Sequence, residues 1–230
     1  MNKDFYDKPL YTITNYIIGF FLGSIYLAIC NILLLLFFIF TATSLDIFNL
    51  LLFFIFLIPM GPSLGALYST NGKLIREKDI NFSSCFWSSY KKNFISHLKP
   101  WLIELIILTI LLIDFKYFYF NMPQTGIYII FGILIIITLL LGLFTLPINS
   151  RFQLNLKDLF MLSLYYMIKK FPITILKIII IILAYLLCKN IPIVFLIFIP
   201  SIICFIFYCY DKNIFIEIEN KLLVNDKLKG

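Results

Sequence analysis

The sequence predicts an all-α fold: a polytopic transmembrane helical bundle of about six spans, with two cytoplasmic amphipathic helices at the membrane interface. Of the 230 residues, 62% are hydrophobic and 13% are charged, and the mean hydropathy is +1.00. A water-soluble domain of this length is about 45–50% apolar and about 25% charged. The apolar residues also form long runs separated by short polar segments, so lipid is the expected solvent for much of the chain.

Six apolar runs approach the roughly 20 residues that a membrane-crossing helix needs. They cover about 16–41, 48–68, 101–120, 126–148, 173–187 and 191–210. The first run is far longer than the roughly 7–15 apolar residues of a signal-peptide core, so we expect it to be a span that is retained. Only three residues join the last two runs, which predicts a tight hairpin or, alternatively, a re-entrant pair.

The lysines and arginines predict the orientation. If the N-terminus is cytoplasmic, all 19 basic residues except Lys116 and Lys189 lie on the cytoplasmic side, which is the positive-inside pattern. We therefore expect a cytoplasmic segment 1–15, a transmembrane domain 16–210 and a cytoplasmic basic tail 211–230. Because topology accounts for the net charge of +7, no nucleic-acid partner is expected.

Two cytoplasmic segments repeat one pattern: "FSSCFWSSYKKNFISHLKPWLIELIIL" (82–108) and "LKDLFMLSLYYMIKKFPITILKIIII" (156–181). Each contains an aromatic stretch with helical spacing, a lysine pair, a proline and an apolar run. Pro100 and Pro172 are expected to end the two surface helices, because proline disfavours helical geometry in the residue before it and suits a new helix start.

The first of these segments carries its aromatic residues on one face. From Phe82 to Leu98 an apolar residue recurs every four positions, which predicts an amphipathic helix in the membrane interface. The alternative is a helix packed on the cytoplasmic rim of the protein itself. The candidates for contacting a partner are Trp87, Tyr90, Lys91 and Lys92.

The stretch "PMGPSLGALYS" (59–69) places helix-breaking residues at the end of the second span. Gly61 and Gly65 repeat the four-residue spacing of Gly19 and Gly23, and small residues at this spacing let helix backbones approach closely. We therefore expect the first and second spans to pack together. Pro59 and Pro62 remove amide donors, so the freed carbonyls need Ser63, water or a neighbouring helix. The alternative interpretation is a broken helix that lines a substrate path.

Few ionisable residues fall inside the spans, where they are candidates for functional sites. Glu104 and Lys177 occupy corresponding depths of the repeated units and are expected to form an intramembrane pair if their helices are neighbours. Alternatively, each extends to the cytoplasmic interface. Asp114 and Lys116 are expected near the outer end of the third span, and Asn31 is expected to make a hydrogen bond between helices.

The sequence contains no recognisable catalytic motif, so no enzymatic activity is expected and no catalytic residue is proposed. No cofactor is expected either. The five cysteines form no C-x-x-C pair, and the single histidine, His97, excludes metal sites built from two or more histidines.

The order of these features resembles the YesL family of small bacterial membrane proteins, a domain family of unknown function. The resemblance covers about residues 15–210 and is carried by "IPMGPSLGALYS", "FWSSYKKNF", "LLIDFKYF" and "LSLYYMIKKFP". The lysine-rich tail departs from many relatives. The resemblance implies a multi-pass protein of a bacterial cell membrane that accompanies carbohydrate-uptake systems of the ATP-binding-cassette (ABC) type.

Two functions are therefore expected. The first is a non-enzymatic accessory component of such an uptake system, with the lipid bilayer and ABC transporter components as partners. The alternative is a small transporter or channel that works as a homo-oligomer. A permease subunit is a third idea, weakened because the sequence has no recognisable glutamate-alanine-alanine-glycine coupling loop.

Overall fold

The computed structural model describes residues 9–40, 47–152, 154–190 and 199–227, and within these ranges the chain forms helices and no strand. In chain order the elements are α1 (Pro9–Cys30), α2 (Ile32–Phe40), α3 (Ile47–Phe56), α4 (Met60–Glu77), α5 (Phe82–Asn121), the short 3-10 helix η2 (Pro123–Thr125), α6 (Ile127–Arg151), α7 (Leu156–Lys169), α8 (Phe171–Asn190) and α10 (Ile199–Lys227). The all-α prediction is confirmed for these residues. The first eight residues of the expected N-terminal segment, and residues 191–198 of the expected sixth span, lie outside them.

The described helices include four or five candidate spans, where the sequence predicts six. Four stretches are long and apolar enough to cross a membrane: Ile13–Cys30, Leu50–Glu77, Ile127–Arg151 and Ile199–Lys221. Helices α7 and α8 count as a fifth only if they are taken as one span with a bend of 90°. The expected third span, 101–120, forms the second half of α5 and is not among these stretches. It carries three ionisable residues, Glu104, Asp114 and Lys116.

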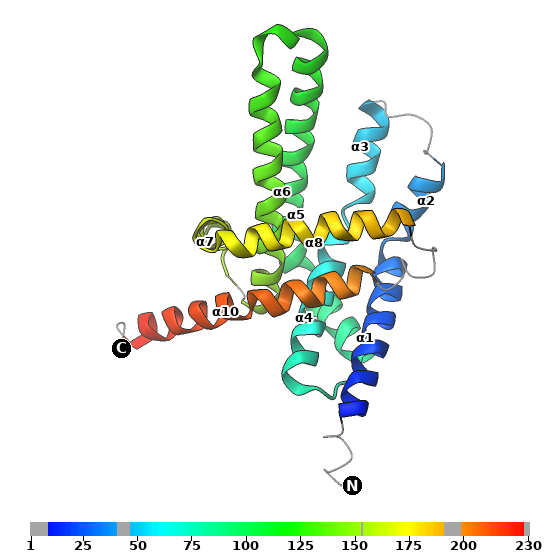
Figure 1. The fold of residues 1–230 in the computed structure, drawn as a ribbon, viewed down its shortest axis with the longest axis vertical. Helices are drawn as coiled ribbons and strands as arrows, with labels where there is room; N and C mark the ends of the chain where they lie inside the picture. The colour runs from blue at the N-terminus through cyan, green and yellow to red at the C-terminus, as the bar shows by residue number, and fades with distance from the viewer. Residues whose placement is uncertain (1–8, 41–46, 153, 191–198, 228–230) are drawn as a thin grey trace.

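Helix α4 lies at the centre of the bundle and contacts α1, α5, α6 and α10 (Figure 1). Helices α5 and α6 form a long antiparallel hairpin closed by η2, and α8 and α10 run side by side across it. At about 1.5 Å per residue the 40 residues of α5 extend about 60 Å, twice the roughly 30 Å of a hydrocarbon core. Only about half of the length of α5 therefore corresponds to the thickness of the hydrocarbon core.

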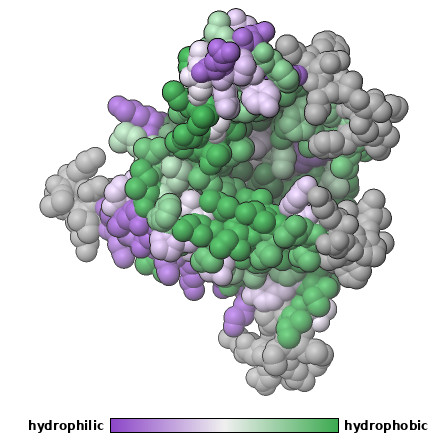
Figure 2. Space-filling model, turned by 45° about the horizontal axis from the view of Figure 1, so that its top comes forward, coloured by the Kyte–Doolittle hydropathy of each residue, from purple (hydrophilic) through white to green (hydrophobic). Residues whose placement is uncertain are grey.

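Much of the surface is apolar. Several isoleucines on α5, α6 and α8 are more than half exposed, among them Ile106, Ile130 and Ile182. Figure 2 shows a broad continuous hydrophobic area on one face of the molecule. Water-soluble monomers rarely expose apolar patches beyond a few hundred Å². The helices and this surface together identify an integral membrane protein.

The two repeated prolines behave differently. Pro172 is the second residue of α8, and the chain bends by 90° between α7 and α8, as predicted. The prediction that Pro100 ends a helix is wrong, because Pro100 lies inside the continuous helix α5. A proline at position 100 leaves the Ser96 carbonyl without its helical donor. The side-chain amide of Asn149 on α6 donates to that carbonyl at 2.9 Å, so the hydrogen bond is replaced and the helix continues.

The glycines of α1 pack as predicted. Gly19 and Gly23 are buried, and a Cβ atom at Gly23 would come within 2.7 Å of Leu67 on α4. The first and second spans are therefore in close contact.

The glycines of α4 do not face α1, and each one is in contact with an aromatic or imidazole ring. A Cβ atom at Gly61 would lie 2.3 Å from Trp101, and one at Gly65 would lie 2.4 Å from His97, both on α5. A Cβ atom at Gly72 would lie 2.5 Å from the ring of Tyr208 on α10. We call these three pairs the glycine–ring contacts.

The break between α3 and α4 is stabilised by neighbouring helices. The indole N–H of Trp101 donates to the Leu57 carbonyl at 3.0 Å, and the Ser63 hydroxyl donates to the Met60 carbonyl at 2.9 Å. The Asn31 amide, at the break between α1 and α2, donates to the Ser63 hydroxyl at 2.9 Å. The expected interhelical hydrogen bond of Asn31 is therefore present, and the Pro/Gly stretch 59–65 forms a bend that packs tightly.

The expected basic tail is a folded part of the molecule over the residues that the structure describes. Helix α10 continues through position 211 without a break, and Asp211, Ile214, Phe215 and Ile218 are buried. The apolar spacing after Tyr210 follows one face of a helix, which is why these residues pack on the bundle.

We expect Gly65→Ala to destabilise the protein, because the new methyl group would overlap the His97 ring in a filled site. Overpacking of this kind costs about 1–3 kcal/mol. The matched control is Gly132→Ala on α6, where the nearest atom to the new methyl group would be at 3.5 Å. Unfolding in detergent measures both variants, and equal effects of the two would contradict the packing described here.

Candidate functional site

A polar cavity of about 610 Å³ lies where α4, the first half of α5, the end of α6, and α10 come together. Its lining consists of Ser69, Thr70, Lys73, Arg76, Ser84, Cys85, Ser88, Ser89, Lys92, Asn93, Ser150, Arg151, Tyr208 and Glu219. Apart from Cys85, every lining side chain carries a polar or charged group. Cavities of a few hundred Å³ are typical of small-molecule sites, and the polar lining of this one favours a hydrophilic ligand.

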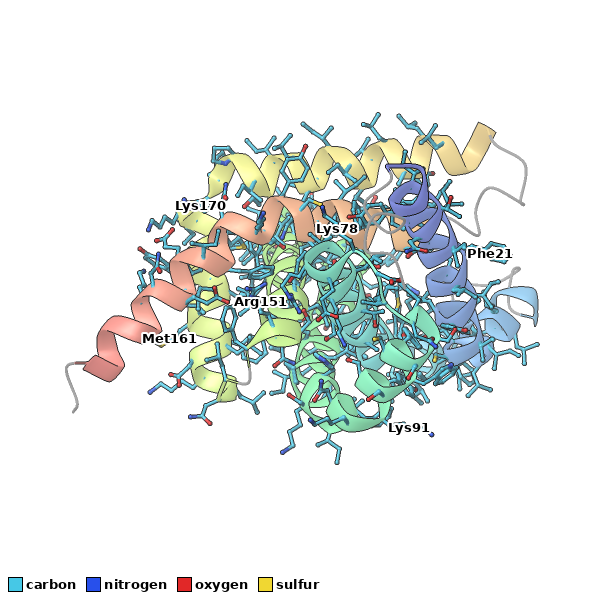
Figure 3. The ribbon with its side chains drawn as sticks, turned by 90° about the horizontal axis from the view of Figure 1, so that it is seen from below. Phe21, Lys78, Lys91, Arg151, Met161 and Lys170 are labelled. Atoms are coloured by element: carbon cyan, nitrogen blue, oxygen red, sulfur yellow. The ribbon has the colours of Figure 1, made fainter. Side chains whose placement is uncertain are left out.

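The cavity is basic, since four of its lining residues are lysine or arginine and one, Glu219, is acidic. Arg76 and Arg151 both donate to the phenol oxygen of Tyr208, at 2.7 and 2.9 Å. Arg151 also donates to Glu219 Oε1 from Nε at 3.0 Å and from Nη2 at 2.6 Å. Figure 3 looks onto this end of the bundle, with Arg151 among the helices and Lys91 at the outer edge of α5.

The position of Tyr208 is set by α4. Its ring packs against Gly72, and its phenol oxygen lies between the two arginines. One glycine–ring contact therefore places the group that connects Arg76 on α4 with Arg151 on α6.

The predicted pairing of Glu104 with Lys177 is wrong. Lys177 binds Asp211 of α10 through both carboxylate oxygens, at 2.8 and 2.9 Å, and donates to the Leu143 carbonyl at 2.9 Å. The side chains of this pair are 0% and 2% exposed, so Lys177 does not extend to the interface either. The ammonium group also lies 3.8 Å from the centroid of the Phe144 ring. Lys177 pairs with α10 because α8 and α10 lie side by side.

Glu104 has a neutral partner. The hydroxyl of Thr145 on α6 donates to Glu104 Oε1 at 2.5 Å, and the carboxylate is buried. Gly142 on α6 leaves room for the Glu104 carboxylate, since a Cβ atom at position 142 would lie 2.8 Å from its second oxygen. Both ionisable residues selected from the sequence are therefore buried, but in two separate contacts.

The aromatic face of 82–98 packs on the protein itself, in line with the alternative interpretation of this segment. The Phe86 ring is fully buried, and the Tyr26 ring of α1 lies 5.2 Å from it and 5.5 Å from Trp87. Of the four candidates for partner contact, Trp87 and Tyr90 are half-buried, whereas Lys91 and Lys92 are exposed. Both lysines are therefore available to a partner. Lys92 also lines the cavity, where it is available to a ligand.

His97 makes a contact that the sequence did not reveal. The amide of Asn149 donates to the Ser96 carbonyl and lies 3.0 Å from His97 Nδ1. The amide nitrogen of Asn149 can only donate, so Nδ1 accepts and the ring proton of neutral His97 is on Nε2, which is buried and has no hydrogen-bond partner among the described residues. His97 precedes the expected span 101–120, and burial lowers its pKa to about 4.

The sequence does not single out four residues that the structure brings into these contacts: Asp211, Arg76, Arg151 and Tyr208. Asp211 directly follows the last apolar run, and the buried positions 214, 215 and 218 continue a helical face beyond it. That spacing was the available signal for Asp211. The other three residues come from segments far apart in the chain. Within the ranges that the structure covers, no three His, Cys, Asp or Glu side chains gather closely enough to hold a metal ion.

Part of the chain matches a described protein family. Residues 27–115 match the model of a family described as "Protein of unknown function, DUF624". The matched part includes the Asn31–Ser63 contact, all of α4 and most of α5. It therefore covers the cavity residues contributed by α4 and α5. No curated protein and no solved structure matches the chain.

We expect Lys177→Met to lower the free energy of unfolding by about 3–5 kcal/mol, because Asp211 would be left as a buried charge without its partner. The double variant Lys177→Met/Asp211→Leu should recover most of this loss. The control, Lys212→Met at an exposed position of the same helix α10, should change stability by less than about 0.5 kcal/mol. Unfolding in detergent provides the comparison, and a mild effect of Lys177→Met alone would contradict the buried pair.

His97 predicts a dependence of stability on pH. The unfolded chain takes up a proton near pH 6.5 and the folded chain near pH 4, so stability is fully present above about pH 6.5 and falls as the pH drops toward 4. Between pH 7 and 5 the wild type should lose up to about 2 kcal/mol more than His97→Gln. Because the chain has one histidine, its imidazole NMR signal can be followed directly. Titration of that signal near pH 6.5 in the folded protein would contradict this assignment.

Proposed function

We propose that the chain is a non-enzymatic accessory component of a membrane transport system, of the bacterial ABC carbohydrate importer type. The resemblance to the YesL family supports an association with an importer of this type. The structure supports an accessory role through contact with a partner. The observation that carries the proposal is the concentration of basic and polar groups at one end of an otherwise apolar bundle. This end is where an accessory protein would meet the water-exposed part of a transporter.

The positive-inside rule places the basic end in the cytoplasm. Lys73, Arg76, Lys91, Lys92 and Lys99 all belong to α4 and the first half of α5, which meet there. With an even number of spans, this orientation also puts both termini on the cytoplasmic side, and the membrane that we propose is a bacterial cell membrane.

The partner surface that we propose is centred on Lys91 and Lys92. Both side chains are exposed, and neither has an ion pair with any described residue. The aromatic side of the same helix is used internally, so it holds the lysines in position and leaves only their charged face for contact. An acidic surface on a transporter subunit complements that face.

The alternative function is a small transporter or channel that acts as a homo-oligomer, and one observation favours it. The break between α1 and α2 meets the break between α3 and α4, where Asn31 binds Ser63. Asn31 Oδ1 is buried and accepts no hydrogen bond from a described residue. Opposed helix breaks with free polar groups are typical of substrate paths in transporters.

Photo-crosslinking tests the accessory function directly. A photoreactive amino acid at Lys92 in the full-length protein, expressed beside an ABC carbohydrate importer, should capture a subunit of that importer. The control position is Ile130, an exposed apolar residue on α6, which should capture lipid instead. Absence of any importer subunit at Lys92, in membranes where the importer itself stays assembled, would overturn the proposal.

Flux measurements in reconstituted vesicles test the alternative. A transporter should move solute or ions across the vesicle membrane, and Asn31→Leu or Ser63→Ala, at the opposed helix breaks, should reduce that flux. Folding of each variant is checked first by gel filtration in detergent. An absence of flux for the folded wild type would remove the alternative and leave the accessory function untouched.

A further inference from the structure

We propose that the polar cavity between α4, α5, α6 and α10 is a binding site for a phosphate group carried on a hydrophilic body. Arg76 and Arg151 are the primary ligands, and Lys73 and Lys92 are secondary ones. The inference does not depend on the transporter partner, since it rests on the lining of the cavity alone.

Two guanidinium groups donate to one phenol oxygen. Arg76 and Arg151 reach the Tyr208 oxygen at 2.7 and 2.9 Å, so their charges lie close together across the cavity. Like charges held this close repel each other unless an anion lies between them. Each guanidinium has five N–H donors in a planar fork that fits phosphate oxygens, and Arg76 uses one of its donors on Tyr208.

The acidic groups present neutralise only part of this charge. Glu219 forms an ion pair with Arg151. The nearest acid for Lys73 is Glu77, at 3.7 Å in an exposed contact of the kind that contributes little. Arg76 and Lys92 have no ion pair with any described residue. The cavity therefore carries uncompensated positive charge from α4 and α5.

The remaining lining suits hydroxyl groups. The cavity, at about 610 Å³, has room for more than a bare phosphate ion. The hydroxyls of Ser84, Ser88 and Ser89 line one side. Ser89 Oγ is buried and has no hydrogen-bond partner among the described residues, so it is free for a ligand. A phosphate ester with further hydroxyl groups would satisfy these positions.

This chemistry has two natural sources at a membrane. One is the headgroup of an anionic lipid with an exposed phosphate, and the other is a soluble phosphate ester. A planar carboxylate would engage one arginine well, whereas the tetrahedral oxygens of phosphate can accept from both arginines and a lysine at once.

The test uses the full-length protein purified in a neutral detergent, with unfolding temperature as the readout. Inorganic phosphate and glycerol 3-phosphate are titrated against sodium chloride of the same ionic strength. Lipid binding is measured in parallel in nanodiscs of phosphatidylcholine with and without phosphatidic acid. Arg76→Gln should weaken binding about ten- to a hundredfold, because a charge-assisted hydrogen bond is lost. Lys92→Gln should weaken binding severalfold.

The matched control is Lys91→Gln, which removes the same charge from the next residue of α5 but outside the cavity. It should change affinity by less than twofold. Saturable stabilisation by glycerol 3-phosphate that depends on Arg76 identifies a soluble ester, and an Arg76-dependent response to phosphatidic acid alone identifies a lipid headgroup. The proposal is overturned if inorganic phosphate and glycerol 3-phosphate do not exceed the chloride control and phosphatidic acid does not exceed phosphatidylcholine alone, or if Lys91→Gln weakens binding as much as Arg76→Gln. Each variant's unfolding temperature without ligand shows that it is folded.

Discussion

Helix α4 can occupy the centre of the bundle because Gly61, Gly65 and Gly72 let three rings reach its backbone. Trp101 and His97 approach from α5, and Tyr208 approaches from α10. Each ring also has a polar atom that makes a further hydrogen bond. The Trp101 indole donates to the carbonyl at the α3–α4 break, the His97 imidazole accepts from Asn149, and the Tyr208 phenol oxygen accepts from two arginines. One of these close contacts, between Gly72 and Tyr208, therefore also places a polar group of the cavity.

The buried charges follow one rule, which is that each has a specific partner on another helix. Lys177 has Asp211 and Glu104 has Thr145, so α8 is tied to α10 and α5 is tied to α6. In hydrocarbon the alternative to such a contact is an unpaired polar group, which is costly. These contacts are few and deeply buried, whereas the cations of the cavity are numerous and partly unpaired. The difference separates groups that hold the fold from groups that are available to bind.

The sequence predicted what depends on neighbouring residues and missed what depends on distant ones. The apolar runs predicted helices, Gly19 and Gly23 predicted the contact of the first two spans, and Pro172 predicted the bend before α8. The predicted helix end at Pro100 is wrong because the missing hydrogen bond is replaced by one from Asn149, which lies about fifty residues away in the chain. Lys177 was given the wrong partner because only the packing of α8 on α10 reveals Asp211. The cavity could not be predicted, since Arg76, Arg151 and Tyr208 come from three separate segments.

The most direct test of this account is a double-mutant cycle between Gly72 and Tyr208, measured by reversible unfolding in detergent. If the tyrosine ring rests on the glycine, Gly72→Ala should cost about 1–3 kcal/mol in the protein that has Tyr208. In the Tyr208→Ala background the same change should cost no more than about 0.5 kcal/mol, because the overlap is gone. Equal costs in the two backgrounds would show that α4 and α10 do not meet through this contact, and would contradict the proposed link between the packing of α4 and the cavity.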